Sequence, residues 1–314
     1  MTPRQLKYFI EIARQLSFTK ASAVLHITQP ALSRQIQELE TTLGVKLFTR
    51  SDLGVSLTAA GQLLKERAPK LIEAYRQVSM DVAALAETPA GSLRFGAPPS
   101  LCDLVTLPSA REYKSAYPGV KLSIIEASST ELTEHISSGS LDFAIVALSG
   151  PTHVFSCTPL LREQMYLASR PGSLTAPARV DPTFLKPLPL VASRQPNALR
   201  RLLDETMLEV GGKPQVVLEA NAVRILTKAS AEGLGHCVLP YSAIAEPVSQ
   251  RQLEARAVNK LFVTWALLHV RNVEPTPSVV ALINTIIAVA RKACSDQRWE
   301  GLEFLAESMP ETRR

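Results

Sequence analysis

Within the first 44 residues, apolar residues recur at helical spacing in three separate series, with polar residues between them. The first series predicts an amphipathic helix with a buried side formed by Leu6, Phe9, Ile10, Ala13 and Leu16. The second predicts a short helix, capped by Ser17 or Thr19, with a buried side of Ala21, Val24 and Leu25. The small Ala21 would let a neighbouring helix approach closely.

A third helix is predicted between Thr28 and Gly44. Thr28 is a good N-cap, and Pro30 is tolerated in the first turn because its missing N–H has no helical partner there. The buried side is marked by Leu32, Ile36, Leu39 and Leu43, and the opposite side carries Gln29, Pro30, Ser33, Arg34 and Gln37. Short donors and acceptors with one arginine are groups that bond base edges and phosphates in a major groove.

The residues after Gly44 predict a two-stranded hairpin. Apolar and polar positions alternate around the polar turn SDLG, with Arg50 near its tip; the apolar ones are Val45, Leu47, Val55 and Leu57. Two helices joined by the short HIT turn and followed by such a hairpin match winged helix-turn-helix geometry. The wing would contact the flanking DNA backbone or the minor groove.

A long helix is predicted after Thr58, since the sequence shows no turn signal before Thr88. Its apolar residues step alternately by four and three, and the series is Leu64, Ala68, Leu71, Tyr75, Val78, Val82 and Leu85. A repeat sustained over three heptads is typical of a coiled-coil seam and predicts a dimerisation helix. The alternative is a long helix packed inside its own chain. Pro69 would remove one helical hydrogen bond and bend the helix.

From residue 91 onward strand-like and helical segments alternate, which indicates an α/β unit with parallel strands. A first round places strands in SLRFGA, VKLSIIEAS and LDFAIVA. A second round places strands in LPLVAS, QVVLEA and HCVLP, with a helix from Asn197 to about Val210. Two similar lobes are therefore expected, with REQMYLAS and FVTWALLH as the segments that cross between them.

Composition narrows the class of protein. Of 314 residues, 46% are hydrophobic and 20% charged, which suits two globular domains. The longest apolar stretches, LFVTWALLHV and VVALINTIIAVA, are shorter than the about 20 residues that a membrane span needs. They predict a buried strand and a packed helix. The N-terminus does not resemble a secretory signal, so no membrane partner and a cytoplasmic location are expected.

Metal, cofactor and enzyme chemistry are not expected. Cys102, Cys157, Cys237 and Cys294 lie far apart without a CxxC pair, and the five histidines are equally scattered. Cys102 is either a reactive thiol near a helix start or a small buried side chain. Nucleophile elbows, Walker loops, HExxH and GxGxxG are all missing from the sequence.

Charge is unevenly distributed along the chain. Residues 1 to 65 carry eight basic and four acidic residues, so +4 of the net charge of +5 lies in the first fifth. This asymmetry favours a polyanionic partner for the N-terminal part.

The run ASAVLHITQPALSRQIQELETTLGVKLFTR and the following LTAAG resemble the N-terminal domain of LysR-type transcriptional regulators, over about the first 65 residues. The resemblance implies a winged helix-turn-helix domain that binds double-stranded DNA. The residues expected to bind it are Thr28, Gln29, Pro30, Ser33, Arg34, Gln37 and Arg50. Leu53 departs from the family, which usually has a basic residue in the wing, so one phosphate contact of the family lacks its cation here.

The C-terminal part resembles the family's effector-sensing domain more loosely, through SGSLDFAIVA, AEGLGHCVLPYSAIA and SRQPNALRRLLDE. That domain has the two-lobed periplasmic-binding-protein type II fold. Ligands of open α/β sheets lie outside the carboxyl ends of strands, where helix N-termini offer free N–H groups. The effector-binding residues expected there are Ser100, Ser128, Ser129, Thr130, Arg194, Asn197 and Asn221. Each is also a plausible plain helix cap; together they suggest a small anionic effector.

The expected organisation is multidomain, α-helical at the start and α/β afterwards. Residues 1–58 form the winged helix-turn-helix domain, 59–88 the dimerisation helix, 89–295 the effector domain and 296–314 a tail. Lobe I would comprise about 91–162 and 268–295, and lobe II about 163–267.

The expected function is a transcriptional regulator that binds a palindromic promoter site as a dimer or tetramer and responds to the effector. Its partners would be DNA, the effector and other copies of the chain, with RNA polymerase as a possible further partner. The alternative is a solute-binding receptor of the same two-lobed fold without a regulatory role.

Overall fold

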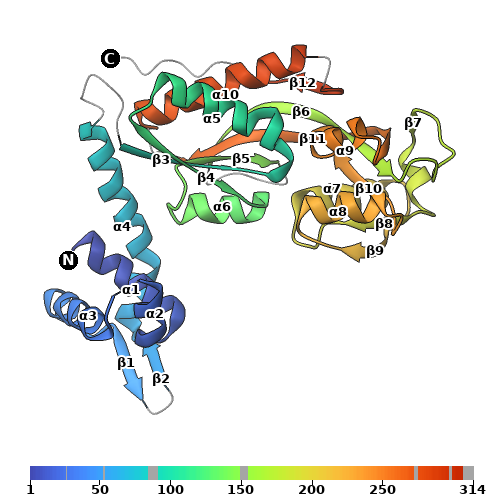
Figure 1. The fold of residues 1–314 in the computed structure, drawn as a ribbon. Coiled ribbons are helices and arrows are strands. Elements are labelled where there is room, and N and C mark those ends of the chain that lie inside the picture. Colours follow the sequence, from blue (N-terminus) through green and yellow to red (C-terminus); the bar gives the residue numbers. More distant parts are fainter. Residues whose placement is uncertain are drawn as a thin grey trace. The chain divides into compact units, whose positions relative to one another are not determined.

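The structure is a computed structural model that describes residues 1–25, 27–51, 54–83, 91–148, 155–271, 275–296 and 299–306. The chain divides into two compact units, Met1–Leu85 and Ala86–Arg314 (Figure 1).

The N-terminal unit is formed by α1 (Pro3–Gln15), α2 (Phe18–Val24), α3 (Gln29–Leu43), the hairpin β1 (Phe48–Ser51) and β2 (Gly54–Leu57), and the long α4 (Ala59–Ala83). Ser17, one of the two predicted candidates, is the N-cap of α2, and its hydroxyl accepts a hydrogen bond from Lys20 N. Gly44 ends α3 in the left-handed conformation, with a φ of 70°. The three helices enclose one core centred on Phe9, Leu32 and Phe48.

Three apolar residues that the spacing predicted to be buried are exposed. Leu16, Val24 and Leu43 are 50%, 48% and 37% exposed. All three stand at helix ends, where the helical face that buries the preceding turns runs out. In α1, Tyr8 and Ile12, which the predicted series did not include, are buried instead of Leu16.

The wing is shorter than the alternation suggested. Its first strand begins at Phe48 rather than Val45, and Val45 is 48% exposed. Leu47 is buried, and Arg50 pairs with Val55 in the antiparallel register. Residues 52 and 53, which include Leu53, lie outside the described residues.

The predicted seam of α4 divides into two parts. Ala68 is fully buried in the core of its own unit, and Leu64 packs against that core, so the in-chain alternative holds for this part and Ala68 has no surface to offer a second chain. The reason is that α1 packs along the first half of α4. Beyond it, Leu71, Tyr75 and Val78 are 43%, 61% and 62% exposed. The side chain of Val82 and all of Leu85 lie outside the described residues.

The first lobe of the C-terminal unit alternates strand and helix as predicted. Its elements are β3 (Gly91–Ala97), the short turns Pro99–Leu101 and Cys102–Thr106, α5 (Leu107–Ala116), β4 (Val120–Glu126), α6 (Ser129–Ser137) and β5 (Phe143–Ala147). β3 pairs in parallel with β4 and with β5, so the carboxyl ends of these three strands meet at one edge.

The second lobe repeats the pattern. It contains β7 (Arg179–Val180), a turn at Pro182–Leu185, β8 (Pro189–Ala192), α7 (Ala198–Glu209), β9 (Gln215–Glu219), α8 (Val223–Ala231), β10 (Cys237–Pro240) and α9 (Tyr241–Ser249). β8 and β9 are parallel, as predicted. The sequence did not predict α9 or β7.

Two long strands, β6 (Phe155–Ser169) and β11 (Glu254–Val270), cross between the lobes and confirm the predicted crossovers (Figure 1). They pair antiparallel from Glu254 with Ser169 to Val270 with Phe155, and they join β10 of one lobe to β5 of the other in a single sheet. A change in lobe angle must therefore bend or shift these two strands.

The chain ends with α10 (Pro277–Ser295) and β12 (Leu302–Phe304). Among the described residues α10 is the one helix long and apolar enough to cross a membrane, but 56% of its most apolar window is buried, as in a core helix. β12 pairs with β6. Part of the segment expected to be an appended tail is thus built into the sheet.

Candidate functional sites

The exposed side of α3 carries the polar residues that the sequence singled out. Thr28, Gln29, Pro30, Arg34 and Gln37 are exposed, and Ser33 is partly exposed. Thr28 lies at the N-cap with extended backbone angles, but its hydroxyl accepts no hydrogen bond from the first turn. The positive end of the helix dipole therefore lies at the start of α3 together with a hydroxyl that makes no cap hydrogen bond.

Arg34 is held by a neighbour that the sequence pattern did not single out. Its Nε lies 3.2 Å from Glu38 Oε1, and Gln35 Nε2 donates to Glu38 Oε2 at 2.8 Å. The side chain of Arg34 is 80% exposed, so this pair contributes about 0.5 kcal/mol or less. Glu38 therefore orients Arg34 without removing it from the surface.

Glu40 connects α3 to the wing. This carboxylate is only 8% exposed and accepts hydrogen bonds from Leu47 N at 2.8 Å, Phe48 N at 3.4 Å and Lys46 Nζ at 2.8 Å. Burial opposes its ionisation, but these donors outweigh burial and hold the pKa of Glu40 below its usual value. The sequence pattern did not indicate this role, because an acid on a helix looks like an ordinary solvated group until the wing is placed beside it.

The wing is also held from α4. Thr58 Oγ1 donates to Lys46 O at 2.7 Å and accepts from Gly61 N at 3.0 Å. A Cβ on Gly61 would lie 2.1 Å from Leu47 O, so only glycine allows this close approach. The wing's start is thereby fixed to both α3 and α4, while the side chain of Arg50 lies outside the described residues.

In the C-terminal unit a cleft of about 440 Å³ lies between the lobes. All seven effector-binding residues predicted from strand ends line it, namely Ser100, Ser128, Ser129, Thr130, Arg194, Asn197 and Asn221. The parallel strands of both lobes end at this cleft, and α6, α7 and α8 begin there.

Some of these polar groups are already committed to caps. Ser128 caps α6: its hydroxyl donates to Glu131 Oε2 at 2.7 Å and accepts from Glu131 N at 3.3 Å. Asn197 caps α7, with Oδ1 accepting from Leu199 N and Arg200 N. Ser129 Oγ accepts from Ala147 N at 2.9 Å and keeps its own proton to donate. Cap and ligand roles are thus distributed over different residues.

Other groups in the cleft are uncommitted. The side chains of Ser100, Thr130, Arg194 and Asn221 form no hydrogen bond with any residue that the structure describes. Arg194 is exposed and has no ion pair within the same residues. Its charge and three helix N-termini favour a negative group, although Glu126, Glu131 and Glu134 also line the cleft.

Trp265 lines the same cleft and was not predicted. It is 1% exposed, and its Nε1 donates to Glu163 Oε2 at 2.7 Å. Glu163 also accepts from Ser242 N at 2.7 Å and Ser242 Oγ at 3.0 Å. Burial raises the pKa of Glu163 to about 7 against the pull of these three donors. One buried carboxylate therefore connects both crossing strands to the start of α9.

Family comparisons match both parts of the chain. Residues 3–62 match the model of the bacterial regulatory helix-turn-helix protein, lysR family, and residues 86–291 match the LysR substrate binding domain. The chain belongs to the LysR family.

Among curated relatives, the nitrogen assimilation regulatory protein nac of Klebsiella aerogenes is 32% identical over 77% of this chain and 79% of its own length. The transcriptional regulator BbuR of Bordetella bronchiseptica is 29% identical over 94% of this chain and 92% of its own. Both names describe regulators.

Solved structures share the fold over nearly the whole length. A full-length OxyR variant from Pseudomonas aeruginosa has 25% identity and a TM-score of 0.67, covering 93% of this chain and 95% of that one. CbnR in complex with its target DNA has 20% identity and a TM-score of 0.64, covering 93% and 100%. Because both family models and the curated regulators match, the LysR-family chain is a DNA-binding transcriptional regulator with an effector-binding domain, and the solute-receptor alternative is set aside.

Proposed function

We propose that this LysR regulator reads DNA with the N-terminal half of α3 placed in the major groove. The exposed polar side of α3 supports this, above all Arg34, whose side chain is 80% exposed. Because the Nε of Arg34 faces Glu38, its two terminal nitrogens would contact a base edge or a phosphate. The proposed contacts are Thr28, Gln29, Pro30, Ser33, Arg34 and Gln37, with Arg50 in the wing.

The regulator would act as a dimer formed through the second half of α4. The exposed Leu71, Tyr75 and Val78 support this, and the seam would continue through Val82 and Leu85. Leu64 and Ala68, by contrast, would stabilise the DNA-binding unit itself. Two recognition helices held by one seam match a palindromic site, and a second interface between effector domains would give a tetramer.

The cleft between the lobes would bind a small effector with a carboxylate or phosphate group. Ser100, Ser129, Thr130, Arg194 and Asn221 have protons available for such a ligand, and they would make the contacts. Ser128 and Asn197 would act indirectly by fixing the starts of α6 and α7.

Effector binding would regulate transcription by shifting the balance between lobe arrangements. A ligand that fits one arrangement better stabilises it. The change would reach DNA through the dimerisation helix and the subunit contacts, and RNA polymerase would be a further partner. We assign 1–58, 59–88 and 89–295 to DNA binding, dimerisation and effector sensing, with residues 296–314 following. The regulator would have no catalytic activity and would work in the cytoplasm.

DNA binding can be tested before the operator is identified. DNA selected from a random pool by the full-length regulator should contain an inverted repeat, because a two-fold symmetric dimer presents two equal helices. The affinity for this DNA should fall steeply between about 50 and 200 mM salt, since phosphate contacts release counterions. Selected DNA without any repeat, or with salt-independent affinity, would contradict the proposal.

The effector can be sought by thermal shift with a library of small carboxylates and phosphates. A true effector should raise the melting temperature of the wild-type regulator, because a ligand that binds only the folded state stabilises it. Arg194→Gln should abolish this shift, whereas Arg201→Gln should keep it, since Arg201 does not line the cleft. Equal shifts in both variants would contradict an anionic site at Arg194.

A further inference from the structure

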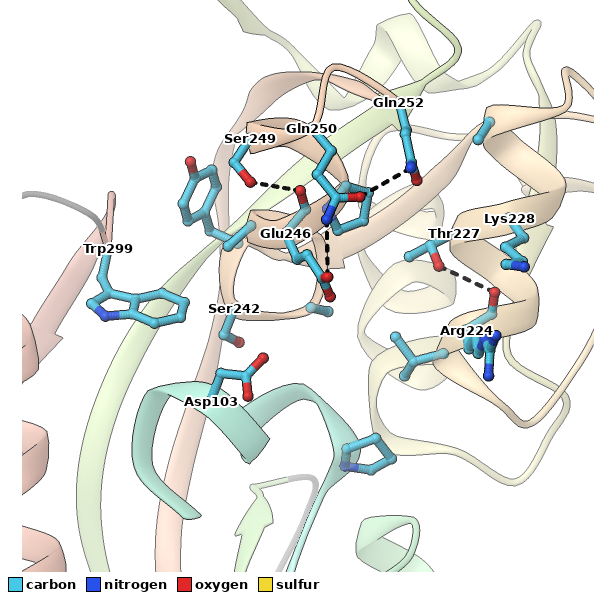
Figure 2. Close-up of a pocket in the computed structure, with 17 residues that line it drawn as sticks. Asp103, Arg224, Thr227, Lys228, Ser242, Glu246, Ser249, Gln250, Gln252 and Trp299 are labelled. Atoms are coloured by element: carbon cyan, nitrogen blue, oxygen red, sulfur yellow. Dashed lines mark hydrogen bonds between the residues drawn. The ribbon is translucent and has the colours of Figure 1, made fainter. Parts of the chain in front are cut away.

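A second hollow of about 980 Å³ lies beside the effector cleft and is here named the α8–α9 groove. Residues of α8 and α9 form two of its sides, and Pro99 and Asp103 of lobe I also line it. Figure 2 shows Asp103 below the α9 side chains and Trp299 at one end of the groove. Pro99 and Val223 line both the groove and the effector cleft, so the two hollows share a wall.

Trp299 is held in place by the end of the chain. Its backbone N–H donates to Asp296 O at 3.1 Å, and Gln164 N donates to Gly301 O at 2.9 Å. Gly301 has a φ of 73°, and a Cβ there would lie 2.6 Å from Gln164 Cβ, so glycine is required for this close approach. The segment that the sequence analysis described only as a tail, residues 296–314, thus places the partly exposed indole of Trp299 at the groove.

One side of the groove is cationic. Arg224 and Lys228 lie one helical turn apart on α8, and both are exposed. Neither forms an ion pair with any residue in the described part of the chain. Figure 2 shows the two side chains on the same face of α8.

The facing side is acidic. Glu246 of α9 accepts a hydrogen bond from Gln250 Nε2 at 3.0 Å, and Asp103 projects from lobe I toward the same space (Figure 2). Neither carboxylate pairs with a cation within 4.0 Å among the described residues. The groove therefore has two basic side chains on one side and two carboxylates on the other, and these four groups form no ion pairs with one another.

We propose that the α8–α9 groove binds a dipolar small molecule, one that carries both a carboxylate and an ammonium group, such as a dipeptide. The carboxylate would face Arg224 and Lys228, and the ammonium would face Asp103 and Glu246. A simple anion would meet the two carboxylates and a simple cation the two basic groups, so only a molecule with both charges matches both sides.

The uncharged lining fits the rest of such a ligand. Trp299 and Tyr241 offer aromatic surface for an apolar side chain. Ser249, Gln250 and Gln252 offer donors and acceptors for a peptide group. The volume is at the upper end of the roughly 300–1,000 Å³ of small-molecule sites and exceeds that of the effector cleft.

The two tryptophans of the chain allow the groove to be observed separately. Trp265 lines the effector cleft and Trp299 the groove. In full-length Trp265→Phe, the emission of Trp299 is measured during titration with leucyl-leucine, N-acetyl-leucyl-leucine and leucyl-leucine amide. We expect a saturable change with the free dipeptide, and at least 10-fold weaker binding of each blocked form. If Trp265→Phe folds poorly, calorimetric titration of the wild type and of Trp299→Ala measures the affinities for the free dipeptide and for its two blocked forms without a fluorescence signal.

Charge variants locate the binding. Arg224→Gln/Lys228→Gln and Asp103→Asn/Glu246→Gln should each weaken dipeptide binding at least 10-fold. Lys213→Gln and Glu205→Gln are matched controls at exposed positions outside the groove and should change nothing. Arg194→Gln, which alters the effector cleft, should also leave dipeptide affinity intact and so separates this proposal from the effector site.

Three results would overturn the proposal. The first is the absence of a saturable response up to about 10 mM dipeptide, a concentration well above the range of a weak millimolar site. The second is equal affinity for the free and the blocked dipeptides. The third is an equal loss in the groove variants and in the matched controls.

Discussion

The DNA-reading surface and the effector cleft are built in opposite ways. The surface of α3 comes from residues 28 to 37 of one helix, whose side chains share a face because of the helical repeat. The cleft collects residues from β3, β4, β8 and β9 ends, which lie far apart in sequence. Local order is enough for the first, whereas the second exists only once two sheets have formed.

Because of this difference, substitutions at the two sites should differ in how far they change ligand or DNA binding without changing the stability of the fold. On α3 the polar residues are exposed and make few contacts within the protein, so a substitution should change DNA affinity while the fold persists. In the cleft Ser128, Ser129 and Asn197 also hold helix ends and a strand end. Substitutions there should affect folding and ligand response together, in proportions that depend on the residue.

Charge reversal of Arg34 should give the largest effect. Arg34→Glu should weaken binding to the selected DNA at least about 100-fold, because it removes a contact worth about 1–3 kcal/mol and adds repulsion from phosphate. Fluorescence anisotropy measures the affinity, and ultracentrifugation should show an unchanged dimer. The control Arg14→Glu lies on α1, where Arg14 pairs with Glu11. Equal losses in the two variants would mean that net charge, not the position on α3, governs binding.

Removal of Glu40 should test whether a residue of the N-terminal unit supports the fold beside a binding surface, as Ser128 and Asn197 do in the cleft. Glu40→Ala leaves Leu47 N and Phe48 N without their acceptor, which should cost about 2 kcal/mol. Hydrogen exchange of the peptide covering β1 should accelerate roughly 30-fold. Glu38→Ala, at an exposed acid one half-turn away, should change exchange by less than about twofold. Unchanged exchange in Glu40→Ala would show that the wing is held without it.

The ionisation of Glu163 should make the C-terminal unit pH-sensitive. The pKa of Glu163 is about 7 when folded and 4.5 when unfolded, so the folded state holds the extra proton between these values. Stability should therefore fall as pH rises through this window, by about 2 kcal/mol from pH 5 to pH 7. Urea unfolding followed by tryptophan emission reports this unit alone, since Trp265 and Trp299 both lie in it.

Glu163→Gln cannot ionise and is the comparison for that measurement. Between pH 5 and pH 7 the free energy of unfolding of this variant should lack the fall of about 2 kcal/mol that Glu163 causes in the wild type. All other titrating groups are retained, so their contribution to the pH dependence should be the same in both proteins. If the free energy of unfolding changes with pH in the same way in the variant and the wild type, the pKa of Glu163 is not raised by burial.

Ser129 and Ser128 should separate ligand contact from capping within the cleft, with the smallest effects. Ser129→Ala should weaken the effector response about 10-fold while basal DNA binding persists, because one donated hydrogen bond to the ligand is lost. Ser128→Ala should instead cost about 1 kcal/mol of stability through the lost cap, with effector affinity nearly unchanged. An effector dose-response of Ser129→Ala that overlays wild type would remove Ser129 from the site.

Much of the fold could be predicted from local patterns. Thr28, Pro30 and Gly44 bounded α3 within a residue of its observed ends, since capping chemistry is local. Helix ends misled the assignment of Leu16 and Val24, because periodicity alone does not say where a partner surface stops. The seam of α4 was misjudged at Ala68 for a similar reason: spacing marks an apolar stripe but not which neighbour covers it.

The sequence by itself determined the order of most elements, with β7, α9 and β12 missed, together with the polar face of α3 and, through the rule on strand ends, all seven residues predicted in the cleft. These follow from short-range geometry and from the parallel pairing that alternating strands and helices impose. Only the tertiary structure decided that Glu40 fixes the wing, that Glu163 joins Trp265 to Ser242, and that Trp299 reaches the α8–α9 groove. Such roles depend on which distant donors or surfaces a side chain meets, and those meetings arise only when the sheets and helices pack.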